Sequence, residues 1–199
     1  MFAAINENLG DFKTASECFE VCLRLKETLY GFNESYTETQ YLFAELQLKL
    51  GDEERALNLF LSILKIRKSC LGVINKKTAQ SLKKVSDIFL SRRAFDKALE
   101  FMSQELKIVE EMVGKCSEEV SNCRYRIGNT HFQLGCYEES ARYFSDALRI
   151  REGLQCDELT TSKTLYMLGR AYFMLSDFNR ACDYFNKGKA HIFCTYRSS

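Results

Sequence analysis

Five small residues recur at an almost constant interval along the chain, and this interval limits the folds that the sequence can adopt. The separations between successive members are 41, 42, 42 and 41 residues, and the five are Ala15, Ala56, Ala98, Ser140 and Ala181. A period of this length, repeated over a whole chain, is typical of arrays built from one supersecondary unit. The interval therefore predicts a tandem repeat and not a single globular core.

Two further columns of residues follow the same register. A bulky side chain stands four residues after each small residue, as Phe19, Phe60, Met102, Phe144 and Phe185. A second small residue stands twelve positions before it, as Ala3, Ala44, Ser86, Gly128 and Gly169. Two helices cross closely only where neither presents a large side chain. We therefore expect the small columns to mark contacts between two helices of each repeat.

Short turn segments separate the two helices. Gly51-Asp52 and Gly135 lie five residues before their small residue, and glycine accepts the left-handed conformation that ends many helices. The aspartate that follows can cap the next helix. The third repeat has Ser91-Arg92-Arg93 at this place, which is a weaker turn signal. One helix pair cannot bury its own apolar face, so each pair should pack on its neighbours.

These columns resemble the tetratricopeptide repeat, in which a large residue precedes Gly or Ala, a turn similar to Gly-Asp-Tyr follows, and Ala and Phe come next. The period of about 42 residues is similar to that of kinesin light chains and nephrocystin-3-like proteins, whose repeats also carry Leu-Gly after the second helix. Here Tyr30-Gly31, Leu71-Gly72 and Val113-Gly114 stand at that place. The resemblance implies an all-α fold, a right-handed α-solenoid of tandem helix-turn-helix repeats.

The sequence departs from that pattern at the start of each repeat. The long-repeat families usually place His-Pro after Leu-Gly, whereas this chain contains no proline. Ser35 with Glu38 is expected to form a capping box that starts the helix without it. Glu105 and Ser140 occupy columns that alanine normally fills. The particular member of the family stays open.

The register divides residues 1–199 into one array of five repeats, approximately at 1–30, 35–71, 77–113, 118–153 and 158–194. The first repeat begins at its large-small pair, Phe2-Ala3, so its first helix is truncated. No polar capping helix follows the last repeat, although solenoids generally need one. We therefore expect a fragment or shortened isoform of a longer array, with exposed end repeats that favour self-association.

Composition excludes several classes of protein. The 28 Lys and Arg residues nearly balance 27 Asp and Glu residues, without the basic excess of a nucleic-acid-binding protein. No apolar run approaches the roughly 18 residues that span a membrane, and Glu7 interrupts any signal-peptide core. Nine scattered cysteines include no Cys-x-x-Cys pair, and Cys18 and Cys22 are better interpreted as small buried residues than as metal ligands. We expect a cytoplasmic protein without a metal.

Nothing in the sequence indicates catalysis or a cofactor. His131 stands where the repeat usually has tyrosine, and His191 lies near the end of the last helix. Neither belongs to a motif that pairs a histidine with a nucleophile. No phosphate-binding glycine loop or calcium loop is present. The chain is therefore not expected to be an enzyme.

The resemblance implies that the first helices of the repeats line a concave face on which peptides bind. By register, the fourth and fifth repeats combine cations, amides and aromatic rings on that face. The candidate partner-binding residues are Tyr125, Arg126, Asn129, Gln133, Lys163, Tyr166, Arg170 and Phe173. Cations and amides can hold carboxylates and backbone groups of a peptide, and aromatic rings supply anchoring area. The alternative, that several of these residues pack between helices, stays open.

Three functions are compatible with such an array. The first is a scaffold or adaptor that binds a somewhat acidic peptide or helix of a partner protein on the concave face. The second is a structural spacer or self-assembly segment of a larger cytoskeletal or ciliary complex. The third is a regulatory array attached to a catalytic domain outside this segment. Asp87 and Met167 replace the asparagine and arginine of the carboxylate clamp in chaperone-binding relatives, so chaperone C-termini are disfavoured as ligands.

Overall fold

The computed structural model describes the backbone of residues 12–197 and the side chains of residues 12–191. Its contacts divide the chain into two compact units, residues 1–88 and residues 89–199. The expectations for Phe2, Ala3 and the truncated first helix lie outside the described residues. Each unit is described by itself below.

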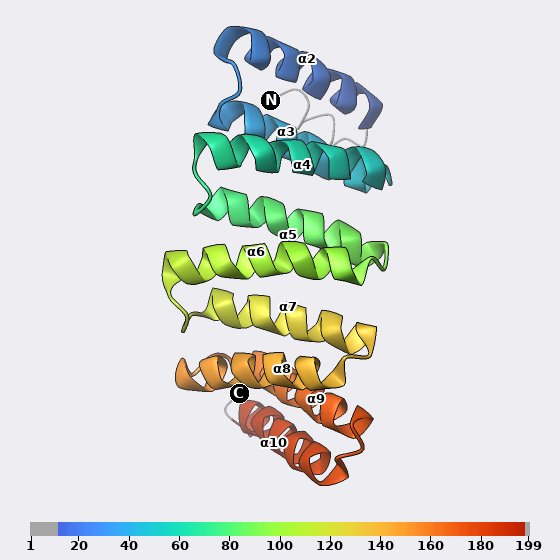
Figure 1. Ribbon diagram of the computed structural model, residues 1–199, viewed down its shortest axis with the longest axis vertical. Coiled ribbons are helices and arrows are strands. Elements are labelled where there is room, and N and C mark those ends of the chain that lie inside the picture. Colours follow the sequence, from blue (N-terminus) through green and yellow to red (C-terminus); the bar gives the residue numbers. More distant parts are fainter. Residues whose placement is uncertain (1–11, 198–199) are drawn as a thin grey trace. The chain divides into compact units, whose positions relative to one another are not determined.

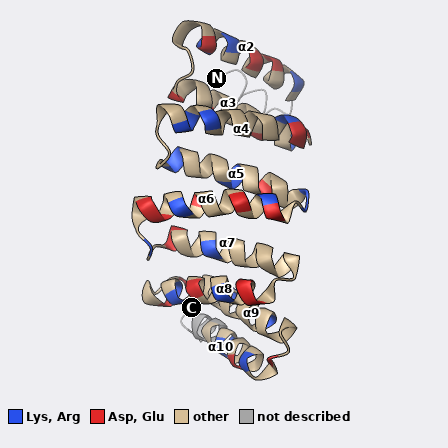
Figure 2. Ribbon diagram, viewed as in Figure 1, with Lys and Arg blue, Asp and Glu red and all other residues tan. Residues whose placement is uncertain are grey.

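Every regular element among residues 12–197 is an α-helix, as the repeat pattern predicts (Figure 1). The helices are α2 (Phe12–Tyr30), α3 (Glu34–Lys49), α4 (Glu53–Cys70), α5 (Lys76–Ser91), α6 (Phe95–Val113), α7 (Glu118–Leu134), α8 (Tyr137–Gly153), α9 (Glu158–Met174) and α10 (Phe178–Arg197). Within the first unit α3 packs on α2 and α4, and within the second each helix from α6 to α10 packs on the next. Acidic and basic residues are interspersed along these helices (Figure 2).

The core of each unit is built from the repeating columns. In the first unit Ala15, Phe19, Phe43 and Leu46 form one buried cluster, in which the rings of Phe19 and Phe43 stack at 5.7 Å. In the second unit a larger cluster joins α8 to α9, with Ala141, Phe144, Leu148, Leu165, Met167, Leu168 and Ala171. Large residues from one helix thus fill the space beside small residues of the next, which stabilises the packing of neighbouring pairs.

Gly128 and Gly169 lie where paired helices cross most closely. A Cβ atom placed on Gly128 would come within 3.1 Å of the Phe144 ring, and one on Gly169 within 2.7 Å of the Phe185 ring. Real Cβ atoms do not approach other side chains as closely as 2.7 Å. The prediction that these glycines mark helix contacts is confirmed, since the bulky column of one helix packs directly on the small column of the other.

The turn inside each helix pair has the same conformation in all four described pairs. Gly51 and Gly135 are left-handed, with φ of 82° and 80°, and Arg93 and Ser176 are left-handed at the equivalent places, with φ of 56° and 61°. In each turn the next residue donates its backbone N–H to a carbonyl five residues earlier, as Ala94 does to Phe89 at 2.9 Å. Residues 91–93 therefore form a turn of the same kind as the others, although their sequence was the weakest turn signal.

Helix starts differ in part from the expectation. The Asn33 Oδ1 atom caps α3 by accepting the backbone N–H of Tyr36 at 2.9 Å. The predicted capping box of Ser35 and Glu38 is wrong, because both residues lie inside the helix that Asn33 begins. Ser35 instead accepts a hydrogen bond from Lys26 Nζ at 2.8 Å. The expected aspartate caps are present, and Asp52 Oδ1 accepts the N–H of Arg55 at 2.9 Å.

Candidate partner-binding surface

Two of the four candidate residues on α7 are engaged in packing between helices. Arg126 Nη1 donates to Glu105 Oε2 on α6 at 2.7 Å, and the two side chains are only 20% and 7% exposed. The Tyr125 ring packs against Phe144 at 5.3 Å, and its burial raises the pKa of the Tyr125 hydroxyl. Arg126 therefore compensates a buried carboxylate, which also explains why Glu105 stands in an alanine column.

The other two candidates on α7 are more accessible. Asn129 is half-buried and Gln133 is exposed near the end of the helix. Between them lies Phe132, whose ring contacts Tyr137 of α8 edge to face at 5.3 Å. The amide of Gln133 is therefore available to a ligand.

The four candidates on α9 are all exposed and lie on one side of the helix. Tyr166 is 55% exposed and Phe173 is 54% exposed. Lys163 lies one turn before Tyr166, and Arg170 lies one turn after it, so the four side chains share one side of the helix. The Arg170 guanidinium lies 4.6 Å from the centre of the Phe132 ring and 5.9 Å from that of Tyr166. A cation over aromatic faces is held in place by the ring quadrupoles. Arg170 is thus a positioned positive charge between the half-buried Phe132 ring and the exposed Tyr166 ring.

Two residues outside the eight candidates, Phe178 and Met174, extend this surface. Phe178, the first residue of α10, is 56% exposed and contacts the Phe173 ring edge to face at 5.5 Å. Met174 is 46% exposed at the end of α9. The signal that could have found Phe178 is its place directly after the turn, where Tyr137 stands in the preceding pair. We call Lys163, Tyr166, Arg170, Phe173, Met174 and Phe178 the α9 surface.

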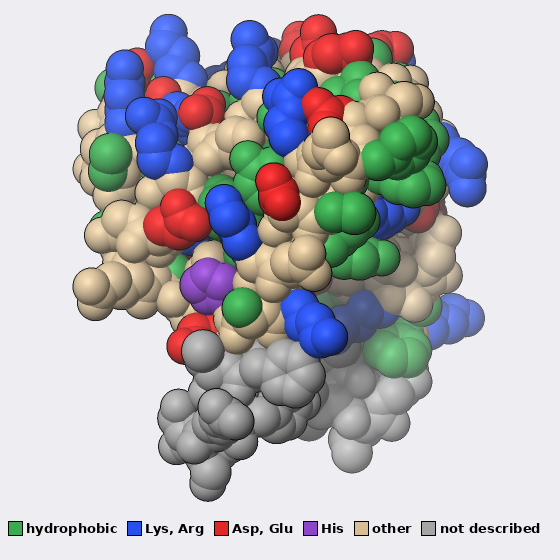
Figure 3. Space-filling model, turned by 90° about the horizontal axis from the view of Figure 1, so that it is seen from below, with side chains coloured by type: hydrophobic (Ala, Val, Ile, Leu, Met, Phe, Trp, Pro, Cys, Tyr) green, Lys and Arg blue, Asp and Glu red, His purple; other side chains and the backbone are tan. Residues whose placement is uncertain are grey.

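A pocket of about 470 Å³ adjoins the α9 surface, between α9 and α10. Its walls are mostly apolar, and they come from Leu159, Ser162, Lys163 and Tyr166 of α9 and from Phe185, Gly188 and Lys189 of α10. Figure 3 views this side of the second unit and shows hydrophobic side chains gathered on one part of it, with Lys and Arg side chains around them. We call this pocket the terminal groove.

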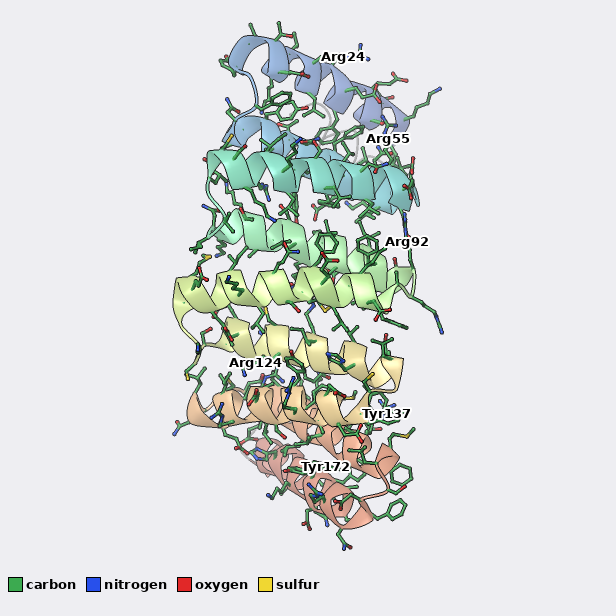
Figure 4. All side chains as sticks on the ribbon, viewed as in Figure 1. Arg24, Arg55, Arg92, Arg124, Tyr137 and Tyr172 are labelled. Atoms are coloured by element: carbon green, nitrogen blue, oxygen red, sulfur yellow. The ribbon has the colours of Figure 1, made fainter. Side chains whose placement is uncertain are left out.

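A second pocket of about 400 Å³ is lined by Lys115, Cys116, Arg124, Arg149, Ile150, Gly153 and Leu154. Its most enclosed cation is already neutralised, because Arg124 contacts Asp146 at 2.6 Å and Glu110 at 2.8 Å. Figure 4 shows Arg124 between α7 and α8, the region that these ion pairs join. This pocket therefore offers less positive charge to an anionic ligand than its residue types suggest.

Three comparable cations connect successive helix pairs. Arg151 donates to the Thr160 carbonyl at 3.0 Å and to the Thr164 hydroxyl on α9, and also to Asn122 Oδ1 at 2.7 Å on α7. Arg67 donates likewise to the Lys77 carbonyl and the Ser81 hydroxyl of α5, at 2.8 and 2.9 Å. Each cation thus satisfies backbone and hydroxyl groups at the start of the next helix.

The third member of the set is Lys26, which donates to the Ser35 carbonyl at 3.1 Å and to the Thr39 hydroxyl at 2.7 Å. Lys26, Arg67 and Arg151 all stand eleven residues after the small residue of their repeat. That shared register was visible in the sequence and would have predicted these contacts. The guanidiniums of Arg67 and Arg151 also lie 5.1 Å from the rings of Tyr41 and Tyr125.

Comparison with known proteins supports the fold described above. A family model described as tetratricopeptide repeat matches residues 120–190. Among solved structures, BtubC (BKLC) from P. vanneervenii is 22% identical with a TM-score of 0.83, over 98% of this chain and 78% of that one. A putative kinesin light chain of Podosopora anserina with nearly identical repeats is 16% identical with a TM-score of 0.80, over 98% and 93%.

Over residues 120–190 the chain is therefore similar to the tetratricopeptide-repeat family, and the solved structures extend the likeness in fold to the rest of the described chain. Its fold is the expected α-solenoid of helix-turn-helix repeats. The apo form of RapI shares that fold, with 17% identity and a TM-score of 0.80, over 95% of this chain and 51% of RapI. No curated protein sequence matches the chain.

Two side chains with reactive groups in the second unit, His131 and Cys123, occupy packing positions. The His131 ring stacks on Tyr143 at 5.4 Å, and burial lowers the pKa of the imidazole. Cys123 is buried beside Glu105, to which its thiol donates at 3.6 Å. Among the described residues no group of three or more His, Cys, Asp or Glu could hold a metal ion. No helix in the described part is long and apolar enough to cross a bilayer.

Proposed function

We propose that the chain is an interaction scaffold that binds an acidic segment of a partner protein on the face formed by α7 and α9. The observation that carries the proposal is the position of Arg170, held on Phe132 at 4.6 Å between the exposed rings of Tyr166 and Phe173. A positioned guanidinium binds carboxylates strongly because little side-chain freedom is lost on binding. Exposed aromatic side chains next to it provide the buried area that anchors an interface.

The distribution of charge favours binding of an acidic segment on the second unit rather than on the first. In the first unit one half-buried cation of the corresponding face is paired, since Lys84 Nζ lies 2.8 Å from Glu45 Oε1. The residues there that are equivalent to Lys163 and Arg170 are acidic, Glu38 and Glu45. On the α9 surface Lys163 and Arg170 add two positive charges beside aromatic side chains. An acidic ligand gains more from such a surface than from one whose charges neutralise each other.

The test is a peptide-display selection on the purified chain, followed by affinity measurement with the enriched peptides. We expect acidic peptides, with affinity lowered at least about tenfold by Arg170→Glu, because a repulsive charge replaces an attractive one. Arg126 is unsuitable for this test, since reversing it would set two carboxylates against each other at Glu105. Lys107→Glu on the exposed side of α6 is the matched control. Enrichment of neutral or basic peptides, or unchanged affinity in Arg170→Glu, would contradict the proposal.

A second candidate function, self-association within a larger cytoskeletal or ciliary assembly, is favoured by a row of apolar residues on α2. Val21, Leu25 and Leu29 are 55%, 56% and 66% exposed at four-residue spacing. The residue equivalent to Leu25 in the fourth repeat, Ile150, is buried. Sedimentation equilibrium of the chain and of Leu25→Lys separates the two functions, because only self-association depends on this row. A monomer at all concentrations excludes the second candidate.

A further inference from the structure

The terminal groove occupies a place that is filled elsewhere in the same unit. Shifting its lining back by 41 residues gives Ser121, Tyr125, Phe144, Ala147 and Leu148 on α7 and α8. There the groove is covered by α9, whose Leu165, Leu168 and Ala171 share one buried cluster with Phe144 and Leu148. The same pair of surfaces, one repeat later, forms the open pocket. The preceding repeat therefore shows what kind of element fits: a helix.

The floor of the terminal groove admits a helix at close range. Gly188 has no side chain, and Ser162 donates its hydroxyl to the Gly188 carbonyl at 3.0 Å, so its polar group is satisfied within the groove. Small residues at a contact allow two helix axes to approach closely. The Phe185 and Tyr166 rings, 5.7 Å apart, form an apolar wall beside this floor. An occupying helix must accordingly present an apolar stripe.

Charge distinguishes the terminal groove from its equivalent. Leu148, which is buried under α9, is replaced by exposed Lys189, and neutral Asn122 is replaced by exposed Lys163. The edges formed by α9 and by α10 therefore each carry a lysine. A helix lying between them meets positive charge on both sides and is favoured when its flanks are acidic.

Tyr166 also differs from its equivalents. Tyr41 and Tyr125 each lie under a guanidinium at 5.1 Å and are half-buried, whereas the Tyr166 ring, with Arg170 more distant at 5.9 Å, is 55% exposed at the groove. A large exposed aromatic residue in a concave apolar site is typical of an interface anchor.

We propose that the terminal groove binds an acidic amphipathic helix of a partner protein, in the position on α9 and α10 that α9 takes on α7 and α8. This inference rests on the proposed function and specifies the ligand as helical, with Tyr166 and Phe185 as apolar contacts. Lys163 and Lys189 select its charge. The helix adds one more layer to the stack of helices in the second unit.

The test uses three synthetic peptides of about 18 residues, long enough for about five helical turns. They share one apolar stripe and carry Glu, Gln or Lys on the opposite face. Binding to the full chain is measured by fluorescence anisotropy, and helix formation on binding by circular dichroism. We expect the Glu peptide to bind at least about tenfold tighter than the Lys peptide and to become helical, with affinity that falls as salt rises.

Two substitutions locate the site. Lys163→Glu should remove the preference for the Glu peptide, and Gly188→Leu should abolish binding by filling the groove. Gly188→Ala is the control for the second, because a Cβ atom there meets neighbours only at 3.4 Å or more. Lys107→Glu is the control for the first, and thermal melting verifies that each variant is folded. Equal affinity for all three peptides, or binding that survives both Lys163→Glu and Gly188→Leu, overturns the inference.

The outcomes also separate this inference from the proposed function. Acidic ligands that are lost in Arg170→Glu but retained in Gly188→Leu leave the α7–α9 face in place and exclude the terminal groove. Acidic ligands that are lost in Gly188→Leu but retained in Arg170→Glu support the terminal groove and exclude the α7–α9 face. If the chain self-associates and Gly188→Leu restores a monomer, the occupant is a second copy and the partner helix is excluded.

Discussion

Gly169 and Gly188 lie on the paired helices α9 and α10, yet they have opposite surroundings. A Cβ atom on Gly169 would approach the Phe185 ring to 2.7 Å, whereas one on Gly188 would touch Leu165 at an ordinary 3.4 Å. The two glycines are otherwise similar helical residues. Comparing alanine substitutions at the two positions therefore separates the effect of steric exclusion from that of helix propensity.

We expect Gly169→Ala to lower the free energy of unfolding by about 1–3 kcal/mol, because the forced shift of Phe185 outweighs the better helix propensity of alanine. Gly188→Ala should be neutral or should raise the free energy of unfolding by up to about 1 kcal/mol. Urea denaturation of both variants measures the difference. Equal effects of the two substitutions would show that close helix crossing does not require glycine at 169.

At the scale of elements, the helix pairs share one turn conformation despite different sequences. Glycine occupies the left-handed position at Gly51 and Gly135, and Arg93 and Ser176 adopt it with φ of 56° and 61°. Left-handed backbone is disfavoured by about 1–2 kcal/mol for residues with a Cβ atom. The backbone hydrogen bond that all four turns share and the packing of the flanking helices offset that cost.

Arg93→Gly and Ser176→Gly should therefore each raise the free energy of unfolding, by about 0.5–1 kcal/mol after the entropy of glycine in the unfolded chain is subtracted. Arg92→Gly, one residue earlier in the same turn, should not stabilise, because Arg92 is not in the left-handed region. Denaturant midpoints of the three variants provide the measurement. A destabilised Arg93→Gly variant would mean that the arginine side chain contributes more than its backbone costs.

At the scale of the whole molecule, stability depends on contacts between neighbouring helix pairs, because no pair buries its apolar face alone. Arg151 is central to one such contact, since its buried guanidinium binds α7 and the start of α9. Arg149, two residues earlier on α8, has a side chain that is 78% exposed and makes only a surface ion pair. The two arginines form a matched pair for substitution.

Arg151→Met should destabilise the second unit by about 2–4 kcal/mol, because buried acceptors lose their donor. Arg149→Met should change stability by less than about 0.5 kcal/mol. Hydrogen exchange followed by mass spectrometry should show faster exchange in α9 and α10 for Arg151→Met only. Protection of α9 and α10 equal to that of the unsubstituted chain would show that Arg151 does not couple the pairs.

Much of the fold was predictable because each repeat must satisfy the same packing requirements and therefore carries the same types of residue at the same positions. Small residues recur where helices must cross, and Gly128 and Gly169 lie at those crossings. Local capping was less predictable, since several polar residues near a helix start compete. Asn33 begins α3 two residues before the predicted Ser35, and Ser35 binds Lys26 instead.

The candidate site was predictable only in part. Register placed eight residues on one face, but register does not reveal which partners a side chain meets across the fold. Arg126 and Glu105 are 21 residues apart in sequence. Their ion pair neutralises the positive charge of Arg126, which the register alone had placed among the ligand-binding residues. Arg170 is on the same face by register, and its contacts are aromatic rings.

The sequence alone determined the repeat, its period, the helical class and the positions where helices approach, because backbone hydrogen bonding and close packing impose these locally and at every repeat. The tertiary structure decided which charges remain available and which surfaces are covered. Tyr125 is half-buried and Tyr166 is exposed although both occupy the same column. The difference arises because α9 packs over the first and leaves the second on the open side of the terminal groove.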